Sequence, residues 1–418
     1  MRIVTFLLLA GALLLTLVSL LIDLRGADPS SLACRIGLCR KDQILDTLKN
    51  RPSVTNHADN LGFRRLIAMA PADAYAWAAL AEYLNSDSSS GSRDARKALD
   101  RAVELAPGVA QIRMRRANLC FETGDKNCVL YDGRDVLGRT TAFDGILFSY
   151  YRYVNVELQN VLKWGLPEEA RAARSWAIYL TKNTNSSFHI LRTWDWLRER
   201  GLADAATVCR LTHELLNKGD PETAWRVWSD YRAVAYGQED GADRLTNAKF
   251  ERQPLESPFD WSVTPQPDVS FRREGGLEVS FRGETNLSLA NVRQVSFVRP
   301  GHHRLVVDIA HEELTTDQGP YVRLFDAEQP GRLSVRTEMF RGSAGRRTVT
   351  VDFVVPPTTR LVAVQLERRP SEKFDNKITG TLRLYRVSLN ELTAKNDTSS
   401  VAGCRRSSEN VSSELPPE

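Results

Sequence analysis

The stretch Ala76-Trp-Ala-Ala-Leu-Ala-Glu-Tyr-Leu84 indicates the fold of the middle of the chain. It is built mainly from strong helix formers, and its apolar residues recur at helical spacing. A second helix of the same texture follows the Ser-rich loop 86–92 and carries Ala95, Leu99 and Ala102. Because small side chains let two helices approach closely, the segment predicts a packed helical hairpin.

Prolines mark the period of this pattern. Pro71 and Pro107 are 36 residues apart, and the residues upstream of each proline match in kind. The pattern resembles the tetratricopeptide repeat, whose motif positions are matched by Trp77, Leu80, Ala81, Ala95, Leu99, Ala102 and Pro107. A weaker match spans 208–231. The resemblance implies an all-α solenoid over 42–236, in which Trp77, Leu99 and Trp228 fill the space between helix pairs.

A solenoid of this kind leaves a concave groove, and the use of the groove stays open at this point. Such grooves commonly bind peptides or proteins, which favours a protein partner bound through the helical repeats. The alternative is a spacer that holds the last domain away from a bilayer, since a fold alone does not fix a function. Aromatic residues are dense over 150–228, and most are expected in the core between helices.

From about Gly237 onward the period of the apolar residues changes from helical to alternating. Alternation predicts strands over 276–282, 304–309, 321–325, 348–353, 361–366 and 380–385. Pro-Gly and Pro-Pro pairs separate several of these segments. Roughly eight to ten short strands at this spacing predict an antiparallel β-sandwich over 245–392. The fold class is therefore multidomain α+β.

Four segments at the edges of this domain have a recognisable pattern: Asn247–Glu251, Pro258–Trp261, Val298–Leu305 and Gly380–Leu389. They resemble the corresponding segments of carbohydrate-binding modules, which have the galactose-binding-like jelly-roll fold. The resemblance implies a jelly roll, with a glycan as a further ligand. The resemblance does not identify a sugar-binding site. Of the aromatic residues in this domain, Trp261 matches a family position, but the residue at that position usually packs in the core.

Members of this family often hold a structural calcium ion with a glutamate at the position of Glu251 and an acidic residue in the last strand. This chain has Arg386 and Val387 in the closing strand. A cation would lose a carboxylate ligand there and would face a guanidinium, so we expect no calcium.

Three of the six histidines lie together, at His302, His303 and His311. Adjacent residues of a strand point to opposite faces, and residues 303 and 311 are far apart along one strand, so we expect surface or turn residues. No Glu-x-x-His spacing, Gly-rich phosphate loop or Gly-x-Ser-x-Gly elbow occurs. We therefore expect no catalytic residue, no cofactor and no metal ligand, and a protein that is not an enzyme.

The first residues have the composition of a membrane segment: Ile3 to Ile22 is a run of twenty uncharged residues rich in Leu. A helix of this length crosses a bilayer core of about 30 Å. We expect an uncleaved anchor over 1–22 and a juxtamembrane linker over 23–41, and the alternative is a cleaved signal peptide. The tail 393–418 is rich in Ser, Glu and Pro and is expected to be disordered.

The cysteines bear on the side of the membrane that the body occupies. Cys34 with Cys39, and Cys120 with Cys128, form close pairs without metal-ligand spacing, which makes them disulfide candidates. Disulfides favour a periplasmic or extracytoplasmic body, and the alternative is buried free thiols. More basic residues follow the apolar run than precede it, and this charge bias favours a cytoplasmic body instead.

These features lead to one main hypothesis and two alternatives. The main hypothesis is a single-pass inner-membrane scaffold that supports surface polysaccharide assembly or export. The alternatives are a carbohydrate-active enzyme with an accessory binding module and a cytoplasm-facing assembly factor. The net charge of +4, spread over 418 residues, excludes a nucleic-acid footprint.

Overall fold

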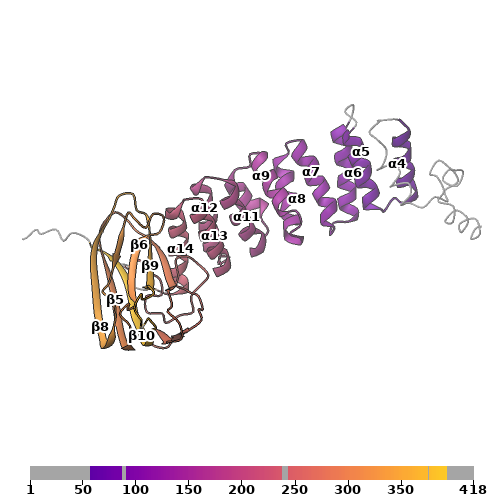
Figure 1. The fold of residues 1–418 in the computed structure, drawn as a ribbon. Helices are drawn as coiled ribbons and strands as arrows, with labels where there is room; N and C mark the ends of the chain where they lie inside the picture. The colour runs from indigo at the N-terminus through magenta and orange to yellow at the C-terminus, as the bar shows by residue number, and fades with distance from the viewer. Residues whose placement is uncertain (1–56, 87–90, 238–242, 375, 393–418) are drawn as a thin grey trace, which may run out of the picture. The chain divides into compact units, whose positions relative to one another are not determined.

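The computed structural model describes residues 57–86, 91–237, 243–374 and 376–392 (Figure 1). The chain divides into two compact units, residues 1–207 and 208–418. In the described residues, the first unit is helical, and the second combines helices with two antiparallel sheets. The predicted order of a helical region followed by an antiparallel β-sandwich is confirmed.

Helices of the first unit follow one another along the chain and pack on their neighbours (Figure 1). They are α4 (His57–Met69), α5 (Ala74–Ser86), α6 (Gly91–Leu105), α7 (Ala110–Glu122), α8 (Lys126–Arg139), α9 (Asp144–Tyr153), α10 (Leu158–Asn160), the π-helix η1 (Val161–Gly165), α11 (Ala170–Asn183) and α12 (Ser187–Glu199). The boundary between the units falls inside α13 (Ala205–Asn217).

The α5–α6 hairpin has the core that its small residues predicted. Ala81, Ala95 and Ala102 are at most 1% exposed and let the two helices pack closely. Trp77 lies against the same core but is only partly buried, and its indole N–H donates to the carbonyl of Pro71 at 3.0 Å. The hydrogen bond holds the indole at the rim of the hairpin, so Trp77 fills less of the interior than the repeat motif implied.

Helices α7 and α8 are joined by covalent and ionic contacts. Cys120 and Cys128 form a disulfide, with Cα atoms 5.8 Å apart. Asp132 is fully buried and accepts two hydrogen bonds from Arg116, at 2.7 and 2.6 Å, and one from Arg113 at 3.3 Å. Burial alone would lower the pKa of Arg116, but these contacts outweigh it and raise the pKa. A buried carboxylate needs such partners, because it has lost the solvation of water.

The second unit contains α14 (Pro221–Ala235) and the strands of a sandwich. The strands are β1 (Ser262–Val263), β2 (Val269–Arg273), β3 (Leu277–Arg282), β4 (Leu289–Phe297), β5 (Gly301–Leu314), β6 (Tyr321–Asp326), β7 (Ser334–Arg336), β8 (Gly342–Val355), β9 (Leu361–Arg368) and β10 (Thr379–Glu391). Within the described residues, β2-β3-β10-β5-β8 form one sheet, called here the β8 sheet, and β1-β4-β9-β6-β7 form the other, the β9 sheet.

All six predicted strand segments lie in strands of these sheets. Alternate residues of β3, β5 and β10 point inward, among them Val279, Val307 and Leu384, and meet Val322 and Leu324 of the β9 sheet. These side chains are at most 2% exposed and make the sandwich core.

Helix α14 packs on the sandwich within the second unit. The Trp228 indole N–H donates to the Thr246 hydroxyl at 2.9 Å, and the rings of Trp225 and Trp228 lie 5.3 and 6.4 Å from the ring of Phe259. Trp228, Thr246 and Phe259 are fully buried. The second helix of the weak repeat, α14, therefore packs on the sandwich through buried aromatic rings.

Several sequence-based predictions lie outside the described residues: the apolar run 3–22, the linker 23–41, Cys34, Cys39 and the tail 393–418. Within the part of the chain that the structure covers, no helix combines the length and the apolar character needed to cross a membrane.

Candidate binding surfaces

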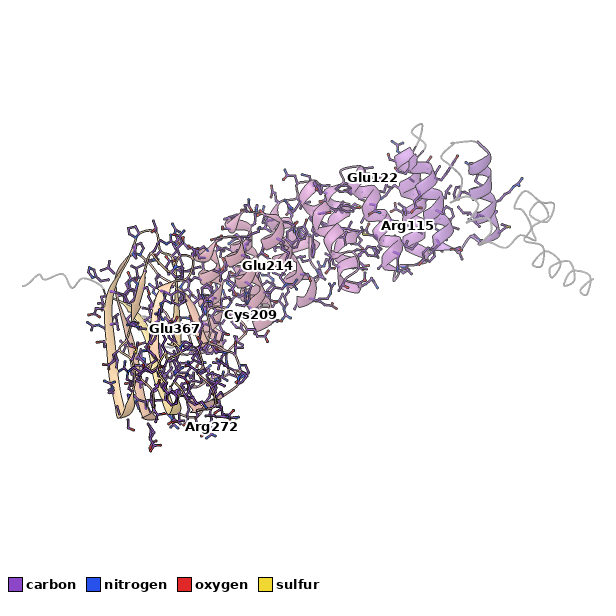
Figure 2. The ribbon with its side chains drawn as sticks, in the orientation of Figure 1. Arg115, Glu122, Cys209, Glu214, Arg272 and Glu367 are labelled. Carbon is purple, nitrogen blue, oxygen red and sulfur yellow. A yellow bond between two sulfur atoms is a disulfide. The ribbon has the colours of Figure 1, made fainter. Side chains whose placement is uncertain are left out.

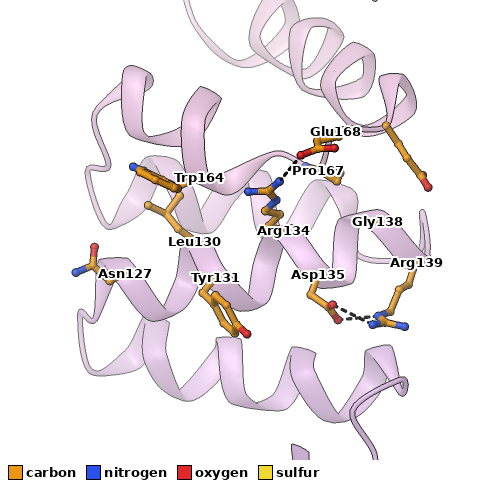
Figure 3. Close-up of a pocket in the computed structure, with 11 residues that line it drawn as sticks. Asn127, Leu130, Tyr131, Arg134, Asp135, Gly138, Arg139, Trp164, Pro167 and Glu168 are labelled. Atoms are coloured by element: carbon orange, nitrogen blue, oxygen red, sulfur yellow. Dashed lines mark hydrogen bonds and ion pairs between the residues drawn. The ribbon is translucent and has the colours of Figure 1, made fainter.

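The first unit has a groove along α8, with a volume of about 960 Å³ (Figure 3). We call it the α8 groove. Residues of α8, η1 and the segment after η1 line it: Asn127, Leu130, Tyr131, Arg134, Asp135, Gly138, Arg139, Trp164, Pro167, Glu168 and Glu169. Tyr131 is 66% exposed and Trp164 is 52% exposed, although both are large apolar rings. Exposed aromatic rings in a concavity are a common feature of binding sites.

The position of Trp164 depends on the π-helix η1. Gly165 ends η1, and a Cβ atom there would come within 2.7 Å of the Leu130 side chain, so a larger residue would force the end of Leu130 to shift. The hydroxyl of the buried Tyr151 donates to the Gly165 carbonyl at 2.9 Å and fixes this end of the turn. Single π-helical turns are frequent at functional sites.

Charged groups in the α8 groove are largely paired with one another. Arg134 lies 3.5 Å from Glu168, and Arg139 lies 2.7 Å from Asp135 (Figure 3). The guanidinium of Arg113 lies 5.8 Å from the Tyr131 ring, and the ammonium of Lys163 lies 4.7 Å from the Trp164 ring. The charges are thus compensated within the groove, and the parts of the Tyr131 and Trp164 rings that these cations leave open offer apolar surface to a ligand.

The second unit has a polar surface on the outer face of the β8 sheet, the face turned away from the core. Figure 2 draws the side chains and labels Arg272, which belongs to β2 of this sheet. Ion pairs cross this face between neighbouring strands. Asp308 of β5 accepts from Arg346 of β8 at 2.7 Å and from Thr348 at 2.8 Å. The Arg346 hydrogen bond holds the pKa of Asp308 below its usual range.

A groove of about 540 Å³ lies on the same sheet. Its lining includes Glu278, Glu312, Thr381, Arg383 and Tyr385. Arg383 pairs with Glu278 across β10 and β3. A tyrosine ring beside carboxylate, hydroxyl and guanidinium groups offers the hydrogen bonds and the flat apolar surface that a sugar needs. Sequence reasoning did not single out Tyr385 or Arg383, because strand alternation alone does not distinguish an outer groove from a plain surface.

Two of the three histidines in β5 are buried, contrary to the prediction from the sequence. His303 is fully buried and His311 is 6% exposed, so the prediction of surface or turn residues is wrong for these two. Each ring Nδ1 lies near a backbone carbonyl: Gly301 at 3.1 Å for His303, and Gly342 at 3.0 Å for His311. Both belong to the inward-pointing set of β5, together with Leu305, Val307 and Ile309, so extending the alternation of 304–309 by two residues would have placed them on the core face.

Side chains with metal-ligand chemistry cluster once in the described residues, at Cys120, Cys128 and Asp132. The two sulfurs are joined in a disulfide, and Asp132 is held by Arg116. A disulfide offers no thiolate, so this cluster as it stands is a structural one.

Arg386 of the closing strand pairs with a buried carboxylate, that of Asp243. Arg386 lies 3.5 Å from the buried carboxylate of Asp243, and Glu251 is exposed to solvent. Burial raises the pKa of Asp243, and the Leu389 and Leu245 amides and Arg386 oppose the rise. Trp261 is 3% exposed and donates to the Asn247 carbonyl at 3.2 Å, so it packs in the core.

Among the comparisons with known proteins, the search of solved structures is the one that finds similar proteins. No protein-family model matches the chain, and no curated protein matches it. Tailspike protein 4 of bacteriophage CBA120, in its enzymatically active domain, is 12% identical over 37% of this chain and 22% of that one, with a TM-score of 0.28. The chain thus spans less than a quarter of that domain.

Two further structures are each similar to one part of the chain. YrrB, a TPR protein with an unusual peptide-binding site, is 15% identical over 44% of this chain and 95% of that one, with a TM-score of 0.23. A CBM4 module is 12% identical over 35% of this chain and 98% of that one, with a TM-score of 0.26. The structures similar to this chain thus include tetratricopeptide-repeat proteins and carbohydrate-binding modules.

Proposed function

We propose that this chain is a non-catalytic scaffold protein that binds a partner protein in the α8 groove and a glycan on the outer face of the β8 sheet. The observation that carries the proposal is the pair of exposed rings, Tyr131 and Trp164, in a concavity built by a π-helix. Leaving two large rings in water is unfavourable, at about 25 cal/mol for each Å² of apolar surface. A partner that covers these rings would recover that free energy.

The test of partner binding is site-specific photocrosslinking in the native cell. A photoreactive residue at position 131 or 164 is expected to capture a discrete partner. Tyr153 supplies the control, since it is 79% exposed but does not line the groove. Tyr131→Ala with Trp164→Ala is then expected to abolish co-purification of that partner, and Tyr153→Ala is expected to preserve it. Equal crosslinking at all three positions would reject the α8 groove as the binding site.

Glycan binding is supported by Tyr385 and Arg383 in the outer groove and by the sequence resemblance to carbohydrate-binding modules. The chain offers a matched pair of arginines for the test. Arg383 pairs with Glu278 on the β8 sheet, and Arg323 pairs with Glu367 on the β9 sheet. Arg383→Ala should weaken binding of envelope polysaccharides in affinity electrophoresis, whereas Arg323→Ala should not. The same incubations are assayed for shortened glycans, and turnover would contradict a non-catalytic role.

We place this scaffold at the inner membrane, with its body on the extracytoplasmic side and a role in surface polysaccharide assembly or export. The Cys120–Cys128 disulfide supports an oxidising compartment. The apolar run 3–22 supports a single-pass anchor. Reporter fusions after Lys41 and Leu392, scored on both sides of the membrane, test the orientation. Extraction by alkaline carbonate tests the anchor, and release of the intact chain would reject it.

A further inference from the structure

Strand β8 is an edge strand that differs from the other edges of the sandwich. It is 14 residues long, whereas the other edge strands, β1, β2 and β7, have two, five and three residues. Proteins commonly keep edge strands short, because a long edge presents a row of unpaired backbone N–H and C=O groups to other chains. In the described part of this chain, β8 pairs with β5 alone.

The sequence of β8 favours further strand pairing. Thr348-Val-Thr-Val351 is a run of β-branched residues without proline, and this run keeps an unbroken register with β5. Thr348 and Thr350 are exposed on the outer face, and Val349 and Val351 are only partly buried on the other. The segment therefore has both a free backbone edge and side chains that gain from cross-strand neighbours.

We infer that β8 pairs antiparallel with β8 of a second copy of this chain, about a twofold axis at Val349. Charge complementarity selects this register. With Val349 opposite itself, Arg346 lies opposite Asp352 of the second copy and Thr348 lies opposite Thr350, all on the outer face. Shifting the axis to position 350 places Thr348 opposite Asp352 and leaves Arg346 opposite Val354, so the opposite-charge pairs are lost.

The neighbouring charges extend this match. Within one copy Arg346 binds Asp308 at 2.7 Å, and Asp352 binds Arg304 at 2.6 and 2.7 Å. Pairing of the two β8 strands would therefore join Asp308, Arg346 and the second copy's Asp352 and Arg304 into a row of alternating charge. Opposite charges that face each other across antiparallel strands stabilise the pair.

The dimer would join two β8 sheets into one ten-stranded sheet, because each β8 sheet has five strands. Paired residues of antiparallel strands project to the same side, so the two outer faces would form one continuous surface. This inference goes beyond the proposed ligands, and it stands whether or not that surface binds a glycan.

The first test uses cysteine crosslinking in the full chain. Residues that face each other across antiparallel strands have Cα atoms about 4.5–5.5 Å apart, within the range that a disulfide spans. Val349→Cys is expected to give a covalent dimer on mild oxidation, because position 349 faces itself. Val354→Cys is the control: it is more accessible, at 55% exposed, but faces Ala344 in the same register. Equal dimer yields, or a yield from position 354 alone, would overturn the inference.

The second test uses sedimentation of the full chain in detergent over a wide range of concentrations. The native chain is expected at about twice its monomer mass of 46.9 kDa. Position 348 of each copy faces position 350 of the other. The double variant Thr348→Lys with Thr350→Lys therefore places two lysines opposite each other at both contacts, and should give the monomer. Thr348→Lys with Thr350→Glu places opposite charges there, and should keep the dimer. Both threonines are exposed, so each variant should fold. A native chain that is monomeric throughout, or two variants that behave alike, would reject β8 pairing.

Discussion

Truncation of Trp228 is the sharpest test of how the second unit is built. The side chain is fully buried between α14 and the sandwich, near Phe259 and hydrogen-bonded to Thr246. A tryptophan buries about 150–250 Å² of surface. At ~25 cal/mol for each Å², this corresponds to roughly 4–6 kcal/mol. Truncations of buried aromatic residues to alanine cost about 3–5 kcal/mol, so we expect a loss of about 4–5 kcal/mol for Trp228→Ala.

The assay is urea unfolding of the fragment 204–392, which keeps α13, α14 and the sandwich together. Trp228→Phe keeps most of the ring but loses the hydrogen bond to Thr246, so it should cost only about 1–2 kcal/mol. Val234→Ala is the control on the same helix, because Val234 is 76% exposed. If Trp228→Ala changed the free energy of unfolding by no more than this control, α14 would not be part of the sandwich core.

Three further predictions follow from the same contacts. The fragment 245–392 should be less stable than 204–392, because Phe259 loses the rings of both α14 tryptophans; equal melting temperatures would contradict this. Asp132→Ala should destabilise the first unit by about 1.5–3 kcal/mol in thermal or urea unfolding, since Arg116 loses both hydrogen bonds to this buried carboxylate and is left with Asp100 at 2.9 Å. Burial would raise the pKa of Asp326, but hydrogen bonds from Thr359, backbone amides and Arg332 outweigh it and hold the pKa below 3.8. Its stabilisation is therefore present above pH 3.8 and lost as the pH falls through the lowered pKa; Asp326→Asn should flatten this dependence in acid unfolding.

Local pattern was enough to predict six of the ten strands and the α5–α6 hairpin in the described residues. Alternation over 304–309 and 380–385 predicted β5 and β10, since side chains of a strand point alternately to the core and to solvent. Small residues such as Ala81 and Ala95 predicted the close α5–α6 hairpin, because they leave room for the facing helix. The change of period near residue 237 likewise predicted where helices give way to strands. These features depend on neighbours in the sequence, so the sequence by itself determined them.

Tertiary structure decided which of these elements are covered and which are open. Trp164 and Trp176 lie in similar helical sequence, but Trp164 is 52% exposed and Trp176 is 2% exposed. The segments that became β8 and β9 both read as strands, yet β9 lies third in its five-stranded sheet and β8 at the edge of the other. His303 and His311 are buried because the face of β5 that carries them meets the β9 sheet. Burial of this kind depends on contacts between residues far apart in the chain, and no local period encodes which distant segment will cover a given face.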